Sequence, residues 1–281
     1  MGKIIYESKG KAQEYGKYGV SAYIGCSNGC KYCYLKTGRF KSVLGGNIPK
    51  LKKCFRDEEH AYTIFAKELR NNLGEYQKYG LFITFSSDPM LPKTFRLTRN
   101  IAWECVTNKV PIKILSKDAD IGNINSIVFN TFYDMFVSNL NECIKYVAFG
   151  FTLTGHDELE PKASPNTERI NAMKLLHNEG FLTFASIEPI IDFTASMDMI
   201  DKSLEFCDLY LIGLKSGQQF DKYSELNLIA FFNTVLKRVQ EYNKKVYFKD
   251  SLLKAVGIDR KYLPEYCVDK DYNLFNNESR K

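Results

Sequence analysis

The chain has 281 residues, 44% of them apolar and 26% charged, so it can bury a sizeable core. Lys and Arg outnumber Asp and Glu by 39 to 33, a net charge of +6. This charge suits an anionic partner such as a nucleotide or nucleic acid, or it reflects a solvated lysine-rich surface, since no long basic run stands out. The opening residues are polar, without the apolar segment of a signal peptide. No stretch approaches the ~20 apolar residues of a membrane span. We therefore expect a cytoplasmic protein with no membrane partner.

Short apolar runs alternate with longer amphipathic segments along the chain. About six such alternations favour a parallel sheet with right-handed crossovers, although periodicity alone does not separate a barrel from an open doubly wound sheet. Strands are expected at 19–24, 81–85, 111–115, 146–153, 181–187 and 209–214, with a further one at 246–249. Helices are expected at 57–73, 94–108, 123–139, 167–179, 194–206 and 225–242.

The chain shows no internal repeat, low-complexity tract or Pro-rich linker. We therefore expect one core domain at 19–250, since barrels of alternating strand and helix often reach this length as one unit. An N-terminal lead-in at 1–18 precedes it. A polar C-terminal tail at 251–281 comes after it, and chain ends of this kind are often frayed.

Three cysteines follow the first expected strand in a C-x3-C-x2-C run. Cys26, Cys30 and Cys33 lie in the segment GCSNGCKYCY at 25–34, where two glycines allow tight turns. Thiolates select zinc or iron–sulfur centres. Structural zinc sites and electron-transfer clusters normally take four protein ligands, and no fourth cysteine is near. Three ligands leave one metal position open, which indicates a centre that binds a reactant.

The alternative is a zinc site that Cys54 or His60 completes, but no His-x3–5-His pair accompanies the run. Cys105, Cys143 and Cys207 fall at apolar helical positions, where we expect them to pack as small hydrophobic side chains.

The spacing of Cys26, Cys30 and Cys33, with aromatic Tyr32 before the last cysteine, resembles the defining motif of the radical S-adenosylmethionine superfamily. The resemblance implies an α/β fold, a partial (β/α)6 barrel of the radical SAM type. It implies that the three cysteines hold a [4Fe–4S] cluster whose open iron binds S-adenosyl-L-methionine, with Tyr32 at the cofactor. An external one-electron reductant of the flavodoxin or ferredoxin type would drive cleavage to a 5′-deoxyadenosyl radical, which abstracts hydrogen from a substrate.

Further cofactor residues are expected at the carboxyl ends of the strands, where α/β barrels place their functional loops. Ser86, Ser87 and Asp88 follow the second strand, and the resemblance implies that this segment contacts the methionyl amino group. Asp88 alternatively caps the next helix. Lys117 follows the third strand and can neutralise the methionyl carboxylate, or it is an exposed surface lysine.

The remaining candidates lie at the ends of later strands. Thr152 and Thr154 end the fourth strand and can bond the ribose or carboxylate, or are ordinary strand threonines. Glu188 at the end of the fifth strand can accept ribose hydroxyls or contact substrate. Gly213 in the sixth strand allows close approach of adenine, or packs beneath a helix.

The segments GCSNGCKYCYL, SSDP, ILSKDADI and SIEPIID resemble spore photoproduct lyase and its DNA-repair-photolyase-like relatives. The lyase family carries a hydrogen-donating cysteine after the second strand, where this chain reads TFSSD at 84–88. We therefore expect a radical enzyme, of lyase or oxidoreductase type, on an unidentified substrate that is nucleic acid or another anionic molecule. A non-catalytic or regulatory cluster-binding module on the same fold is the alternative.

Overall fold

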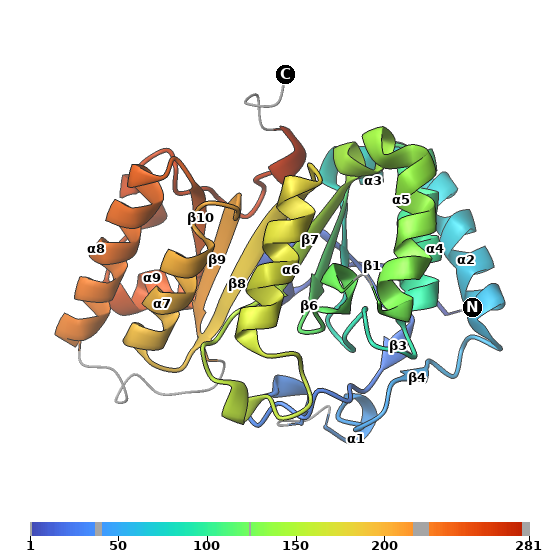
Figure 1. Ribbon diagram of the computed structural model, residues 1–281, viewed down its shortest axis with the longest axis horizontal. Helices are drawn as coiled ribbons and strands as arrows, with labels where there is room; N and C mark the ends of the chain where they lie inside the picture. The colour runs from blue at the N-terminus through green and yellow to red at the C-terminus, as the bar shows by residue number, and fades with distance from the viewer. Residues whose placement is uncertain (1, 37–40, 124, 216–224, 277–281) are drawn as a thin grey trace.

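The computed structural model describes residues 2–36, 41–123, 125–215 and 225–276 (Figure 1). An eight-stranded sheet runs in the order β1-β2-β5-β6-β7-β8-β9-β10, and β3 and β4 form a separate antiparallel pair. All neighbours from β2 to β10 are parallel, whereas β1 is antiparallel to β2. Within the described ranges, no helix is both long enough and apolar enough to span a membrane.

The strands are β1 (Ile5–Glu7), β2 (Tyr18–Val20), β3 (Tyr23–Ile24), β4 (Lys50–Leu51), β5 (Leu81–Ile83), β6 (Ile112–Ser116), β7 (Val147–Thr152), β8 (Leu182–Ile190), β9 (Leu209–Leu214) and β10 (Lys245–Phe248). The helices are α1 (Lys41–Leu44), α2 (Glu58–Asn71), α3 (Leu73–Tyr79), α4 (Phe95–Thr107), α5 (Ile127–Tyr146), α6 (Asn166–Asn178), α7 (Phe193–Ser203), α8 (Glu225–Glu241) and α9 (Asp250–Val256). Short 3-10 turns include η1 (Gly10–Glu14), η2 (Tyr34–Lys36) and η4 (Asp157–Leu159).

Helices follow β2, β5, β6, β7, β8 and β9 in turn, so the chain builds a partial (β/α)6 barrel, and the fold class expected from the sequence is confirmed. Aspartate side chains cap the start of two helices. Asp57 accepts from the backbone N–H of His60 at 2.7 Å at the start of α2, and Asp192 accepts from Ala195 at 2.8 Å at the start of α7. The carboxyl ends of the parallel strands lie at the lower edge of Figure 1, next to β3, β4 and α1.

The sheet buries apolar residues on both faces, as parallel sheets do. One face packs against the surrounding helices and holds the larger core cluster. On the other face, which we call the inner face, Phe82, Phe184 and Leu211 meet Val268 and Leu274 near the C-terminus. The C-terminal segment therefore covers part of the inner face.

Several expected boundaries differ from the structure. The strand expected at 19–24 is two short strands, β2 and β3, which pair in different sheets. The expected lead-in supplies β1 to the main sheet, and the expected tail supplies most of α9 and the buried Leu252 and Leu274. Both segments thus pack against the barrel, while the domain limits at 18 and 250 remain predictions.

Candidate functional site

A cavity of about 490 Å³ lies at the carboxyl ends of the sheet strands. Its wall includes Thr84, Ser116 and Thr152, at or just after the ends of β5, β6 and β7, and Glu188 near the end of β8. Its volume lies within the range of about 300–1,000 Å³ that is typical of small-molecule sites. This edge is also where α/β barrels carry their active sites.

The loop after β3 brings Cys26, Cys30 and Cys33 to the wall of this cavity. Gly25 begins the loop with a φ of +82°, and a Cβ there would lie 2.7 Å from the carbonyl oxygen of Ile48. The turn therefore requires glycine on two grounds, backbone conformation and space. A tight loop that starts in this way lets all three thiols face one space.

Burial governs the protonation of these thiols. Burial, with a smaller contribution from the nearby Asp88 carboxylate, raises the pKa of Cys26 to about 12. Burial also raises the pKa of Cys30, while Lys117 lowers it. These two thiols are therefore protonated in the metal-free chain at neutral pH, and binding a metal centre would release their protons.

The donor set of the loop fits a [4Fe–4S] cluster held by three cysteines. No group of three or more His, Cys, Asp or Glu side chains among the described residues is arranged around a single metal ion. A cubane differs from such a site, because each cysteine binds its own iron. The other five cysteines lie away from the cavity wall: Cys54, Cys105, Cys143, Cys207 and Cys267.

The residues of the alternative zinc site lie elsewhere. The side chain of Cys54 is exposed and packs beside Gly2. His60 is in the first turn of α2, where its Nδ1 accepts from the backbone N–H of Arg56 at 3.1 Å. Neither side chain belongs to the cavity wall that holds the three motif cysteines.

Tyr32 lines the cavity and is held from behind by a buried ion pair. Its hydroxyl donates to Glu160, whose other carboxylate oxygen pairs with Nη2 of Arg169 at 2.7 Å. Both charged side chains are fully buried, and Arg169 also donates to the carbonyl of Thr152 at 2.8 Å. The pair thus fixes the ring of Tyr32 over the cavity. Lys117 lies across the ring face, 5.6 Å from its centroid.

Asp88 ties the cysteine loop to the strand ends. Its Oδ2 accepts from Nδ2 of Asn28 and from the backbone N–H of Lys117, both at 2.8 Å. Its Oδ1 accepts from Ser116 Oγ at 2.6 Å and from the backbone N–H of Met90 at 3.0 Å. Asp88 does not cap α4, whose N-cap residue is Thr94. With four donors on two oxygens, its role in the structure is to position the loop.

The two serines before Asp88 diverge. Ser87 belongs to the cavity wall, and its hydroxyl is 3.5 Å from the carbonyl oxygen of Asp88. Ser86 is buried outside the wall, where its hydroxyl bonds Ser21 and donates to the carbonyl of Tyr23 at 2.6 Å. Only Ser87 of this pair is therefore placed to reach a ligand in the cavity.

Two more candidates, Lys117 and Thr152, lie in the cavity wall. Thr154 lies outside it and is fully buried, with its hydroxyl accepting from the backbone N–H of His156 at 3.3 Å. Lys117 lies near the cysteine loop, and its positive charge lowers the pKa of both Cys26 and Cys30.

Glu188 faces the cavity but is already paired. Its Oε2 accepts from the hydroxyl of Tyr15 at 2.6 Å and forms an ion pair with Lys249. Gly213 lies outside the cavity wall. It leaves space for the Lys249 side chain, because a Cβ at 213 would lie 2.6 Å from Cδ of Lys249. The close approach at Gly213 is therefore that of a lysine side chain of the protein itself.

Sequence reasoning missed the inner wall of the cavity. Tyr15 comes from the expected lead-in and bonds both Glu188 and Ser186, the latter at 2.9 Å. Lys249 lies at the end of β10, and its ammonium group is 3.7 Å from the centroid of the Tyr15 ring. Burial raises the pKa of Tyr15 well above its usual value, and Glu188 adds to this effect. The only local sign of this wall in the sequence is Gly213, which leaves space for the side chain of Lys249.

The fold and this cavity define a partial (β/α)6 barrel with a three-cysteine loop at the carboxyl ends of its strands. No protein-family model matches the chain. It is similar to an uncharacterized protein of Methanocaldococcus jannaschii, at 26% identity over 270 residues that cover 86% of this chain and 90% of that protein.

Among solved structures, the chain is similar to SuiB of Streptococcus suis. SuiB bound to S-adenosylmethionine gives a TM-score of 0.54 at 14% identity over 84% of this chain. SuiB bound to the precursor peptide SuiA gives 0.55 at 12% identity over 88% of it. The chain spans about half the length of SuiB, 51% and 52% in the two comparisons. At these identities the likeness is one of fold.

Proposed function

We propose that this chain is a radical S-adenosylmethionine enzyme, which holds a [4Fe–4S] cluster on Cys26, Cys30 and Cys33 and binds S-adenosyl-L-methionine in the adjoining cavity. One observation carries the proposal: the three thiols of a C-x3-C-x2-C loop line a single cavity of about 490 Å³ at the carboxyl ends of the barrel strands. The fold likeness to SuiB, which has been solved with S-adenosylmethionine bound, supports it.

When bound, these groups supply a one-electron cleavage of the sulfonium that yields methionine and a 5′-deoxyadenosyl radical. The chain's own residues bind and orient the ligand. Lys117 supplies a positive charge beside the cysteine loop for the methionyl carboxylate, and Ser87 and Thr152 offer hydroxyls in the same wall. Tyr32 supplies a ring fixed by Glu160.

The part of the cavity lined by lysines suits an anionic substrate. Lys9 and Lys11 of the N-terminal segment line the cavity together with Lys215 after β9 and Lys249 after β10, and Lys249 is paired with Glu188. Apolar side chains of the wall, such as Phe82, Phe85 and Leu115, limit water around the reacting groups.

The type of reaction, lyase or oxidoreductase, rests on the sequence resemblance to the spore photoproduct lyase-like branch. That branch has a hydrogen-donating cysteine after the second strand, whereas the corresponding wall here carries Thr84 and Ser87. We therefore propose that hydrogen return, if the reaction includes it, uses a group other than a cysteine at this place.

Anaerobic reconstitution with iron and sulfide tests the proposal. We expect about four irons and four sulfides per chain, and 5′-deoxyadenosine on addition of dithionite and S-adenosylmethionine. Cys30→Ala should lose the cluster and the product together. Zinc binding without iron-dependent absorbance would refute the cluster assignment. A cluster that yields no 5′-deoxyadenosine would leave a cluster-binding module without radical chemistry.

A further inference from the structure

A buried ion pair lies behind the cysteine loop. Glu160 belongs to the segment between β7 and α6, at 153–165, which we call the β7–α6 loop, and Arg169 lies at the start of α6. Oε2 of Glu160 and Nη2 of Arg169 are 2.7 Å apart, and both side chains are 0% exposed. Taking two charges out of water is costly, and apolar side chains of similar volume often stabilise a protein as well or better. Stability alone therefore does not account for an ion pair at this place.

The guanidinium of Arg169 connects the pair to the end of a barrel strand. Its Nη1 donates to the carbonyl of Thr152 at 2.8 Å, and its Nε donates to the carbonyl of Ser164 at 2.7 Å. Thr152 ends β7 and belongs to the cavity wall. Because the planar guanidinium has partners on three of its nitrogens, its orientation is fixed. Its positive charge is therefore held at one position behind the cavity wall.

The β7–α6 loop is bonded to the cysteine loop through the backbone as well. The backbone N–H of Lys31 donates to the carbonyl of Leu159 at 2.9 Å. The backbone N–H of Lys162 donates to the carbonyl of Asn28 at 3.1 Å. These two bonds flank the second cysteine of the motif, so the two loops are held together on both sides of it.

The carboxylate of Glu160 completes the connection to the cysteine loop. Its Oε1 accepts from the hydroxyl of Tyr32, which directly precedes Cys33 in sequence. Glu160 thus places a negative charge one hydrogen bond from the cysteine loop, and Arg169 places a positive charge behind it. Neither charged side chain belongs to the cavity wall. Both can therefore act on the centre only through the cysteine loop and through space.

Fixed charges beside an iron–sulfur cluster alter its reduction potential. Reduction adds one electron, which the external one-electron reductant supplies, and no bond is made or broken. A nearby positive charge favours the added electron and a nearby negative charge opposes it, and both effects are larger in a buried site than in water. Glu160 and Arg169 therefore act in opposite directions, and each offsets the other while the pair is intact.

We propose that Glu160 and Arg169 are positioning residues that set the reduction potential of the centre held by the cysteine loop. Arg169 favours the reduced centre, while Glu160 offsets this effect and holds Tyr32 at the cavity wall. The proposal rests on the proposed function and adds two residues from outside the cavity wall that tune its centre.

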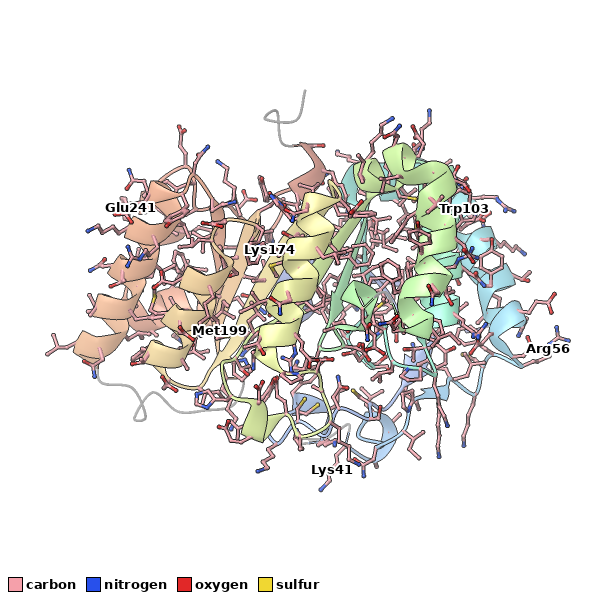
Figure 2. The ribbon with its side chains drawn as sticks, in the orientation of Figure 1. Lys41, Arg56, Trp103, Lys174, Met199 and Glu241 are labelled. Carbon is pink, nitrogen blue, oxygen red and sulfur yellow. The ribbon has the colours of Figure 1, made fainter. Side chains whose placement is uncertain are left out.

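A second Tyr–Glu–Arg group provides a matched control. Glu104 in α4 accepts from the hydroxyl of Tyr62 at 2.7 Å and from Nη2 of Arg70 at 2.9 Å. Its side chain is 10% exposed, so it is nearly as buried as that of Glu160. Figure 2 labels Trp103, the residue before Glu104, well away from the strand ends at the lower edge. Glu104 thus shares the chemistry of Glu160 without its closeness to the cysteine loop.

The test is a redox titration of the reconstituted protein, followed by EPR. Glu160→Gln leaves the Arg169 charge unpaired, because a guanidinium does not lose its proton in proteins. We expect the ratio of reduced to oxidised centre at a fixed potential to rise about tenfold, which for a one-electron centre equals a shift of about 59 mV. Arg169→Met leaves a carboxylate instead, so the ratio should fall, and most at high pH, where a buried carboxylate is ionised.

The double variant Glu160→Gln/Arg169→Met separates charge from packing. Neither charge of the pair remains in it, so the ratio should return to within about threefold of the wild type. Loss of packing would instead expose the centre to water in both single variants and shift the ratio in the same direction in both. Either single variant compared with the double variant gives the sign of one charge, so the test holds if one of them fails to fold. Glu104→Gln should leave the ratio unchanged.

Shifts in the same direction in the two single variants would overturn the proposal. So would ratios within about twofold of the wild type in both, at equal iron content. If the shifts are opposite but no 5′-deoxyadenosine forms on addition of S-adenosylmethionine, the positioning role stands and the proposed function fails. If 5′-deoxyadenosine forms and the potential does not respond to either charge, only the positioning role fails. A wild-type protein that binds no iron would overturn both.

Discussion

The ion pair between Glu188 and Lys249 is the most informative place to perturb the inner wall of the cavity. It joins β8 to the end of β10, and the Tyr15 hydroxyl donates to the same carboxylate. The two partners are unequally buried: 2% of the Lys249 side chain is exposed, against 16% for Glu188. The cost of removing one partner should therefore depend strongly on which one is removed.

Glu188→Gln leaves a buried ammonium group without its counter-charge. Breaking a buried ion pair from one side costs about 3–5 kcal/mol, because the remaining charge is desolvated and unpaired. Lys249→Met leaves a carboxylate that is more exposed and still accepts from Tyr15, so we expect a loss of about 1–2 kcal/mol. In the double variant neither charge of this pair remains, and the free energy of unfolding should return to within about 1 kcal/mol of the wild type.

The loss in Glu188→Gln should also depend on pH. Burial lowers the pKa of Lys249 below its ordinary 10.5, and Glu188 opposes that shift. Without Glu188 the pKa falls further, so the unfolded chain binds more protons than the folded chain between the lowered value and 10.5. Stability rises with pH where the unfolded state binds more protons. The deficit of Glu188→Gln should therefore shrink between pH 7 and pH 9.5.

Urea unfolding of the four proteins in this cycle, at both pH values, measures the coupling free energy. A coupling below about 0.5 kcal/mol, or equal losses in the two single variants, would refute the ion-pair reasoning.

Four further outcomes are expected. Burial raises the pKa of Asp118 from 3.8 to about 7, so the wild type loses stability as the pH rises through that window. In urea titrations, Asp118→Asn should therefore raise the free energy of unfolding by about 1–3 kcal/mol at pH 8 and by almost nothing below pH 4. Gly213→Ala should destabilise the fold by displacing Lys249, and the loss should be smaller in a Lys249→Ala background, which lacks the Cγ and Cδ atoms that a Cβ at 213 would meet. Lys117→Ala should weaken S-adenosylmethionine binding about ten- to a hundredfold in calorimetry and leave the iron content unchanged. Cys54→Ala should keep full iron content on reconstitution.

The sequence predicted the parallel strands and the helices between them because short apolar runs alternate with longer amphipathic segments. It also predicted that the cysteine loop, Lys117 and Thr152 lie close together, because the carboxyl ends of parallel strands share one edge of the sheet. Residues directly after a strand could thus be placed without knowledge of distant contacts.

The inner wall could not be placed in this way. Tyr15 reaches the cavity from a segment with no strand or helix pattern, and its partners lie 171 and 173 positions away in sequence. Ser86 was expected beside the cofactor, but its side chain lies outside the cavity wall and its hydroxyl bonds that of Ser21. Asp88 was placed at the right edge, but its four donors come from three separate segments. Local patterns carry no signal for such contacts.

The most direct test of the central claim is the EPR spectrum of the reduced, reconstituted protein with and without S-adenosylmethionine. A centre held by three cysteines has one iron open to the cofactor, so we expect the g values to shift when S-adenosylmethionine is added. The shift should require a higher cofactor concentration in Lys117→Ala. A spectrum identical in the presence and absence of S-adenosylmethionine would contradict the account, because it would show a centre that does not bind the cofactor.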